Sequence, residues 1–157
     1  MRATRFTHAS VHARELEESA RFYADVFGMR RVPSHDFPDM EVVWLQFGDV
    51  QLHLFRRDDP APAFHHVGLD VDDFETAYRI AVERGLFDGG EPRVRELNDG
   101  ALQMYLRDPA GNLVEVNWPD ASTIDRSVVT TIVPLGDERL QSDEALKATL
   151  YPAQQHA

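Results

Sequence analysis

The chain has 157 residues, of which 43% are hydrophobic, so its length and composition suit one ordinary domain with a single core. Its 16 Lys and Arg against 27 Asp and Glu give a net charge of −11, which disfavours nucleic acid and anionic membrane surfaces as partners. The absence of cysteine excludes disulfides and thiolate metal ligands, and the absence of a long apolar run points to a cytoplasmic protein.

An internal repeat organises the chain. His66 follows His8 by 58 positions, and Phe64 follows Phe6 by the same interval. The interval also joins further apolar pairs, which are Val11 with Leu69, Leu16 with Phe74, Ala20 with Tyr78, Phe22 with Ile80 and Ala24 with Val82. A duplicated supersecondary unit explains this pattern. We therefore predict one domain over residues 1–118, with modules at 5–57 and 63–118, and a tail at 119–157 that packs on the domain or forms a dimer contact.

The first module begins with a predicted strand at 5–13, which leads into an amphipathic helix. This helix has an apolar stripe at helical spacing, formed by Leu16, Ala20, Tyr23 and Phe27. Gly28 is expected to end the helix, because glycine readily adopts the left-handed conformation found after helices. Further strands are predicted at 30–34, 41–47 and 50–56, with Gly48 and Asp49 as a two-residue hairpin turn.

The second module repeats this order after a proline-stiffened linker at 58–62. A strand at 63–71 precedes a helix, which is expected to begin after Asp72 or Asp73 and to end at Gly85. The apolar stripe of this helix is Phe74, Ala77, Tyr78 and Ala81. Strands at 93–97, 101–107 and 113–118 follow, so the fold class is α+β with two βαβββ modules. In the tail only one weak helix, at about 142–150, is predicted.

Strand parity places four potential metal ligands on the less apolar faces of their strands. Successive strand residues point to opposite faces, and the side chains opposite the aliphatic rows include His8, His53, His66 and Glu115. Hairpin register places Trp44 across from His53 and Tyr105 across from Glu115. Tyr105 is expected to orient Glu115, with proton donation to a substrate as the alternative. The same faces predict a substrate pocket, lined by Ser10, Trp44, Gln46, Gln51, Phe55, Gln103 and Arg107.

The remaining histidines are His12, His35, His65 and His156. A lone histidine is more often satisfied by one hydrogen bond than functional, so no role is assigned to them. His65 is predicted to face the core, because it directly precedes His66 on the same strand.

Several segments resemble the vicinal oxygen chelate superfamily, which contains glyoxalases, bleomycin-resistance proteins and extradiol dioxygenases. The resemblance covers residues 5–118 and is carried by segments 6–11, 18–29, 50–55, 66–73 and 108–115. The last segment is the most specific, with Asp108, Pro109, Gly111 and Asn112 followed by Glu115. The resemblance implies two βαβββ modules that form a curved mixed sheet around one divalent metal ion. The implied ligands are His8, His53, His66 and Glu115.

The resemblance leaves the reaction open at His53. Glyoxalase-like members usually carry Glu at this position and epimerase-like members Gln, whereas extradiol dioxygenases and fosfomycin-modifying enzymes use two His and one Glu. If all four side chains bind an octahedral ion, two positions remain for vicinal substrate oxygens, as a lyase or isomerase requires. If His53 stays off the metal, three positions remain for a catecholate and dioxygen, and His53 becomes an acid–base group.

The leading hypothesis is a metal-dependent, glyoxalase-like lyase or isomerase that acts on a small molecule with vicinal oxygens. Its candidate catalytic residues are His53, Glu115 and Tyr105, and its candidate metals are Fe, Mn, Zn, Ni and Co. The main alternative is an extradiol-type ring-cleaving dioxygenase that uses Fe(II). A further alternative is an antibiotic-resistance protein that modifies fosfomycin or binds a drug. Similar proteins are often dimers, so we also expect a homodimer.

Overall fold

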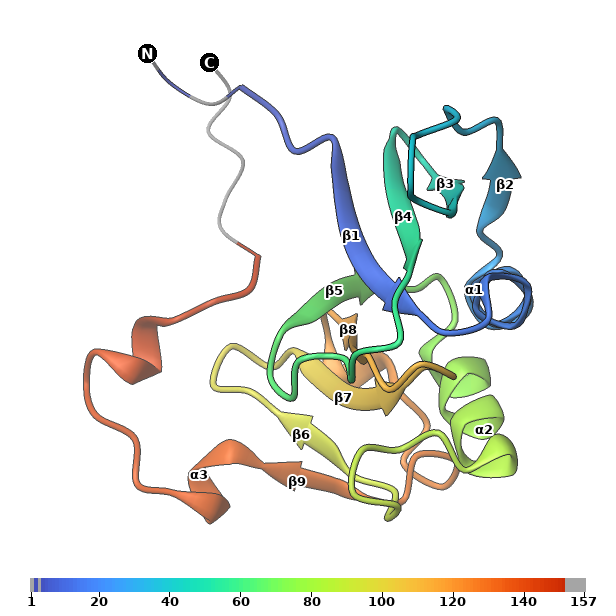
Figure 1. The fold of residues 1–157 in the computed structure, drawn as a ribbon. Helices are drawn as coiled ribbons and strands as arrows, with labels where there is room; N and C mark the ends of the chain where they lie inside the picture. Colours follow the sequence, from blue (N-terminus) through green and yellow to red (C-terminus); the bar gives the residue numbers. More distant parts are fainter. Residues whose placement is uncertain (1, 3, 152–157) are drawn as a thin grey trace. The chain divides into compact units, whose positions relative to one another are not determined.

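The computed structural model describes residue 2 and residues 4–151 (Figure 1). The chain divides into two compact units. The first unit comprises residues 1–67 and 107–113, and the second comprises residues 68–106 and 114–157. His156, to which the sequence assigned no role, lies outside the described residues.

A four-stranded sheet forms the centre of the first unit, with the strand order β1-β4-β3-β2. Its strands are β1 (His8–Ala13), β2 (Arg30–Val32), β3 (Val42–Phe47) and β4 (Val50–Arg56). Strand β1 pairs with β4 in parallel, and the other pairs are antiparallel. The predicted hairpin register is confirmed, because Trp44 lies opposite His53 and Gln46 lies opposite Gln51.

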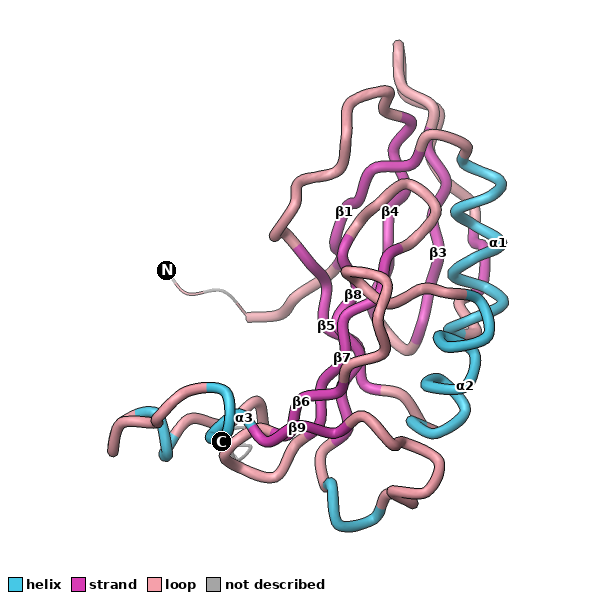
Figure 2. The backbone as a smooth tube through the Cα atoms, turned by 90° about the horizontal axis from the view of Figure 1, so that it is seen from below, coloured by secondary structure: helices cyan, strands magenta, loops and turns pink. Residues whose placement is uncertain are grey.

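Helix α1 (Leu16–Phe27) lies against strands β2, β3 and β4 of this sheet (Figure 2). It ends as predicted at Gly28, whose φ of 64° is left-handed and whose backbone N–H donates to Ala24. The face that it buries comprises Ser19, Ala20, Phe22 and Tyr23. Of the predicted stripe, Ala20 and Tyr23 are buried and Leu16 and Phe27 are half-buried, while Ser19 and Phe22 join the buried face.

The turn 108–112 belongs to the first unit and connects β1, α1 and its own backbone. Both carboxylate oxygens of Asp108 accept hydrogen bonds, from the Tyr23 hydroxyl, from the backbone N–H groups of Ala110 and Asn112, and from the Asn112 amide. Asn112 in turn bonds to both backbone groups of His12. The most specific motif of the sequence thus has a structural use, because it satisfies buried polar groups of three segments.

A five-stranded sheet contains the remaining strands, in the order β5-β8-β7-β6-β9. Its strands are β5 (His66–Asp70), β6 (Val94–Glu96), β7 (Leu102–Arg107), β8 (Leu113–Trp118) and β9 (Ile132–Pro134). Strand β9 was not predicted, and it pairs in parallel with β6. The tail therefore extends the second sheet by one edge strand.

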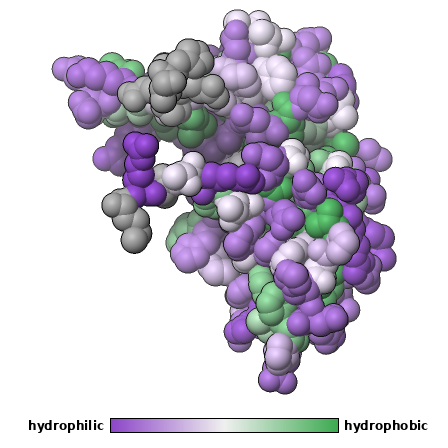
Figure 3. Space-filling view, turned by 90° about the horizontal axis from the view of Figure 1, so that it is seen from above, coloured by the Kyte–Doolittle hydropathy of each residue, from purple (hydrophilic) through white to green (hydrophobic). Residues whose placement is uncertain are grey.

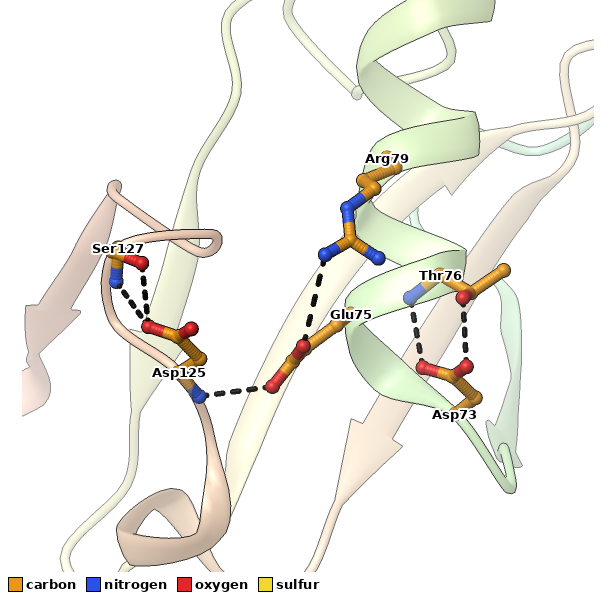
Figure 4. A network of polar contacts seen from close by, with 6 residues as sticks. All are labelled: Asp73, Glu75, Thr76, Arg79, Asp125 and Ser127. Carbon is orange, nitrogen blue, oxygen red and sulfur yellow. Dashed lines mark hydrogen bonds and ion pairs between the residues drawn. The ribbon is translucent and has the colours of Figure 1, made fainter.

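Helix α2 (Phe74–Arg84) begins and ends where the sequence indicated. The carboxylate of Asp73 accepts from the Thr76 backbone N–H at 2.9 Å, and Gly85 ends the helix with a φ of 62°. Its buried residues are Phe74, Ala77, Tyr78 and Ala81, as predicted. Figure 4 shows that Glu75 on this helix accepts from the Asp125 backbone N–H, which attaches the loop after β8 to the helix.

As far as residue 151, the rest of the tail contains only short helical segments. These are η1 (Ala121–Thr123), α3 (Leu135–Glu138) and η2 (Ala145–Lys147). The helix predicted at about 142–150 was wrong, since only η2 forms there. Leu146 and Leu150 are 57% and 42% exposed, so packing does not offset the cost of nucleating an isolated helix.

The core side of each sheet matches the parity prediction. Leu52 and Leu54 in the first unit, and Met104, Val114 and Val116 in the second, are almost fully buried. Figure 3 shows a mainly hydrophilic surface with scattered apolar side chains, in keeping with the net charge of −11. Among the described residues, no helix is both long and apolar enough to cross a membrane. The α+β class with repeated modules is confirmed.

Candidate functional site

Two of the predicted ligands lie side by side in the first unit. The parallel register aligns His8 with Gln51 and Ser10 with His53, so His8 and His53 share one face of the sheet. Their rings are stacked, with centroids 4.3 Å apart and planes 14° from parallel. His8 is exposed, whereas His53 is only 7% exposed. Strand parity predicted that these two imidazoles share one face of the sheet, and the structure places them in contact.

The ring of His53 is enclosed between two other rings. The indole of Trp44 stacks on the face opposite His8, with centroids 4.3 Å apart and planes 4° from parallel. The Nε2 of His53 is 2.9 Å from Gln51 Oε1, an oxygen that can only accept, so the proton lies on Nε2 and the lone pair on Nδ1. Burial and the nearby charge of His8 lower the pKa of His53 below 6.5. His53 is therefore a neutral imidazole at neutral pH.

A cavity of about 320 Å³ lies in the first unit, at the C-terminal ends of β1 and β4. Its lining residues are Ser10, Val11, His12, Asp39, Met40, Phe55, Arg56 and Arg57. Ser10 and Phe55, which the sequence assigned to a substrate pocket, are among the residues that line this cavity. Gln46 instead donates to the carbonyl of Gly48 and accepts from Arg30, so its amide supports the hairpin end.

Glu115 is the predicted ligand that lies in the second unit, and it is 6% exposed on β8. The Tyr105 hydroxyl donates to its Oε2 at 2.6 Å. Burial, followed by the hydrogen bond to Glu115, raises the pKa of Tyr105 to about 12. The tyrosine thus remains a hydrogen-bond donor at neutral pH, which is the contact that its expected orienting role requires.

Sequence reasoning missed Asn117, which lies two residues beyond Glu115 and therefore on the same face of β8. Asn117 is 7% exposed, and its Oδ1 is buried without a hydrogen-bond partner. A Cβ at Gly68 would lie 3.4 Å from Asn117 Nδ2 and 3.7 Å from Glu115 Oε1, so glycine leaves space beside both side chains. The parity rule that selected Glu115 could also have selected Asn117.

The other predicted pocket residues differ in their surroundings. Gln103 is 8% exposed and accepts from Arg95 at 3.4 Å. Arg107 donates to the backbone carbonyls of Gly111 and Ala63, so it supports the chain in the first unit.

His65 is exposed and lies before β5, so the prediction that it faces the core was wrong. The strand begins at His66, three residues later than the predicted start at 63, so strand parity does not apply to His65.

Two features of the predicted ligands decide whether they could bind one metal ion. These are the chemistry of the donor atoms and the orientation of the imidazole rings. Imidazole and carboxylate donors suit Fe, Mn, Zn, Ni or Co. The lone pair of an imidazole lies in its ring plane, so the two stacked rings of His8 and His53 do not point at one ion. His66 donates from Nδ1 to the Phe64 carbonyl at 3.0 Å, which places its lone pair on Nε2. Within the described residues, no three His, Asp or Glu side chains form a metal-binding cluster. The donor types therefore suit a metal ion, but the ring planes of His8 and His53 do not converge on one ion.

Comparison with known proteins extends these observations. Glyoxylase I 4 of Arabidopsis thaliana is 25% identical over 152 residues, which cover 92% of this chain and 83% of that protein. The mitochondrial methylmalonyl-CoA epimerase of Mus musculus is 26% identical over 135 residues, which cover 71% of each chain. Among solved structures, oxidase ChaP-H1 is 31% identical with a TM-score of 0.57, and the match covers 73% of this chain and 95% of that one.

The family model described as the glyoxalase/bleomycin resistance protein/dioxygenase superfamily matches residues 5–116. The matched range includes the first βαβββ module, all but the last two residues of the second, and all four predicted ligands. The chain therefore belongs to the glyoxalase/bleomycin resistance protein/dioxygenase superfamily.

Proposed function

We propose that this chain is a metal-dependent lyase or isomerase that acts on a small molecule with two adjacent oxygen atoms. One divalent ion would be held by His8, His66 and Glu115. The observation that carries the proposal is the neutral imidazole of His53, stacked on the ring of His8. A basic nitrogen next to a proposed metal ligand supports a reaction in which a proton is moved.

The bound ion would supply Lewis-acid stabilisation of the negative charge that develops on the substrate oxygens. His53 has the role of general base through Nδ1, because Gln51 holds the proton on Nε2. Tyr105 positions Glu115 through its hydroxyl. Trp44 covers the second face of His53 and so limits the access of water to that ring. One carboxylate leaves the dication with a formal positive charge, which favours anionic substrate oxygens.

The names of two relatives support this reaction class. A glyoxylase matches 92% of the chain, and an epimerase matches 71%. Both names fit a lyase or isomerase better than an oxidising enzyme. The proposed reaction class is that of the leading hypothesis formed from the sequence. The ligand set differs, because that hypothesis counted His53 as a fourth ligand, whereas His53 is proposed here as the base.

The test uses the full chain loaded separately with Fe(II), Mn, Zn, Ni or Co under argon. Each form is assayed for turnover of hemithioacetals and for exchange of substrate C–H hydrogen with deuterated water. The His53→Gln variant is expected to lose about 10²- to 10⁴-fold in rate, the usual contribution of a general base. His65→Gln, which removes an exposed imidazole, serves as the control. Turnover that is unchanged in His53→Gln would contradict the proposed role.

A ring-cleaving dioxygenase is the second candidate, and a specific observation favours it. With His53 off the metal, His8, His66 and Glu115 form a two-His, one-carboxylate set, which is the ligand type of non-haem Fe(II) oxygenases. The relative at 31% identity is named an oxidase. Oxygen uptake by the Fe(II) form on a panel of catechols, with ring-cleaved product in equal amount, would support this candidate and contradict the lyase or isomerase.

The homodimer stays a prediction, for which membership of the family is the support. Size-exclusion chromatography with light scattering measures it directly. We expect a mass of twice the 17.9 kDa of one chain, and a single-chain mass at micromolar concentration would contradict the dimer.

A further inference from the structure

The second unit contains a cavity of about 190 Å³, of whose lining only Tyr105 has a role in the proposed reaction. Its lining residues are Phe87, Asp88, Arg93, Arg95, Gln103 and Tyr105. Arg93 lies just before β6 and Arg95 lies within it. The cavity therefore has two arginines in its lining.

Both guanidinium groups are bound by one carboxylate from the tail. Arg93 Nη2 pairs with Glu138 Oε1, and Arg95 Nε donates to Glu138 Oε2 at 2.8 Å. Each carboxylate oxygen thus has its own arginine, and the Glu138 side chain is only 18% exposed. This arrangement is how proteins commonly recognise a carboxylate or phosphate group, because the planar guanidinium matches the oxygen spacing.

The carboxylate that binds the arginines belongs to a segment without buried side chains, which hydrogen bonds with Asn98 and Asp99 attach to the second unit. Glu138 is the last residue of α3 (Leu135–Glu138), a helix with no buried residue. The following segment, 139–150, contains no buried residue either. Moving Glu138 away from the arginines would therefore expose little apolar surface, and the main loss would be an ion pair near the surface.

A chain of polar contacts leads from the arginines to the proposed site. Arg95 Nη1 donates to Gln103 Oε1 at 3.4 Å, and Gln103 is buried on β7. Two residues along β7, Tyr105 lines the same cavity and donates to Glu115. A small molecule in the cavity would consequently contact the side chain that positions a proposed metal ligand.

We propose that Arg93 and Arg95 bind a carboxylate or phosphate group of a small molecule, and that Glu138 occupies this place until the ligand displaces it. Asp88 lines the same cavity, so two arginines and one aspartate leave a single positive charge once Glu138 departs. A group of low charge fits that balance better than a polyanion. Where this ligand is the substrate itself, the inference rests on the proposed function. The substrate would then carry a carboxylate or phosphate group in addition to its two adjacent oxygen atoms.

The test measures anion binding to the metal-free full chain, with inorganic phosphate and glutarate as separate probes. Arginine Nε–H resonances are followed by NMR during each titration. In Glu138→Gln the internal carboxylate is removed, so both arginines are available and we expect binding about two- to fivefold tighter than in the wild type. The two probes distinguish a phosphate site from a carboxylate site.

A matched control exists in the same unit. Arg126 Nη2 pairs with Glu96 Oε2 at 2.8 Å, and neither residue is in the cavity lining. Glu96→Gln is expected to leave probe binding unchanged. Adding Arg95→Gln to Glu138→Gln should abolish the gain, and Arg95→Lys, which keeps the charge and the fold, should weaken it.

The proposal is overturned if Glu138→Gln binds neither probe more tightly than the wild type, or if Arg95→Lys and Arg95→Gln leave the gain intact. The readout needs neither metal nor turnover. Failure of the metal-dependent reaction would therefore leave this result unchanged, and failure of anion binding would leave the metal assays unchanged.

Discussion

The imidazole rings of His8 and His53 lie face to face, with centroids 4.3 Å apart and planes 14° from parallel. Two stacked rings direct their in-plane lone pairs along separate planes, so they do not converge on one ion. The stack of Trp44 on the other face of His53 restricts rotation of that ring. This geometry favours His8 as a metal ligand with His53 as a base over both residues as ligands of the same ion.

Metal stoichiometry tests this division of roles. We expect His8→Ala and Glu115→Ala to lose stoichiometric metal, since each removes a proposed ligand. His53→Gln should retain about one ion per chain, with an affinity reduced less than tenfold. Elemental analysis after loading and desalting measures all three, and His65→Gln is the control. Equal loss of metal in His53→Gln and His8→Ala would show that His53 is a ligand.

The stability of the chain should depend on the protonation of His53. Burial and the charge of His8 lower the pKa of His53 below 6.5, the value expected of the unfolded chain. Below that value the unfolded chain binds more protons than the folded one, so the free energy of unfolding falls as the pH falls. Thermal melts between about pH 7.5 and 5 should therefore show a steeper loss for the wild type than for His53→Gln. Parallel curves would contradict the lowered pKa.

Removal of the Tyr105 hydroxyl should weaken metal binding without unfolding the chain. In Tyr105→Phe the buried Glu115 carboxylate loses a donor at 2.6 Å, so its orientation is less restricted. Loss of such an outer contact usually lowers metal affinity about 10- to 100-fold. Competition with a chelating dye measures the affinity. Tyr78→Phe, which removes a hydroxyl that contacts Thr131, is the control, and an equal effect in both variants would exclude a specific role.

The turn at Asp108 should contribute more to stability than to chemistry. Tyr23→Phe removes one hydrogen bond at 2.9 Å and should cost about 0.5–1.5 kcal/mol. Asp108→Ala leaves buried donors of Tyr23 and Asn112 unpaired, so we expect a larger cost of about 2–4 kcal/mol. Urea unfolding measures both. A cost for Asp108→Ala no larger than that for Tyr23→Phe would contradict this reading of the turn.

Both long helices and eight strands could be predicted from the sequence, because their signals are local. Apolar spacing and a terminal glycine indicated where each helix lies, and the structure ends them at Gly28 and Gly85. The two-residue turn at Gly48 and Asp49 determined the hairpin register, since so short a connection allows few alternatives. The edge strand β9 was not predicted, because it lies in the tail, beyond the repeat that supported the equally short strands β2 and β6.

By itself the sequence determined the repeated α+β architecture and the strand faces that carry His8, His53 and Glu115, because periodicity depends on backbone geometry alone. It did not determine that the ring of His53 stacks between those of His8 and Trp44, since side-chain torsions depend on packing. Nor did it indicate that Glu138 meets Arg93 and Arg95, because more than 40 residues separate them. Contacts of this kind are decided only when the tertiary structure brings distant side chains together.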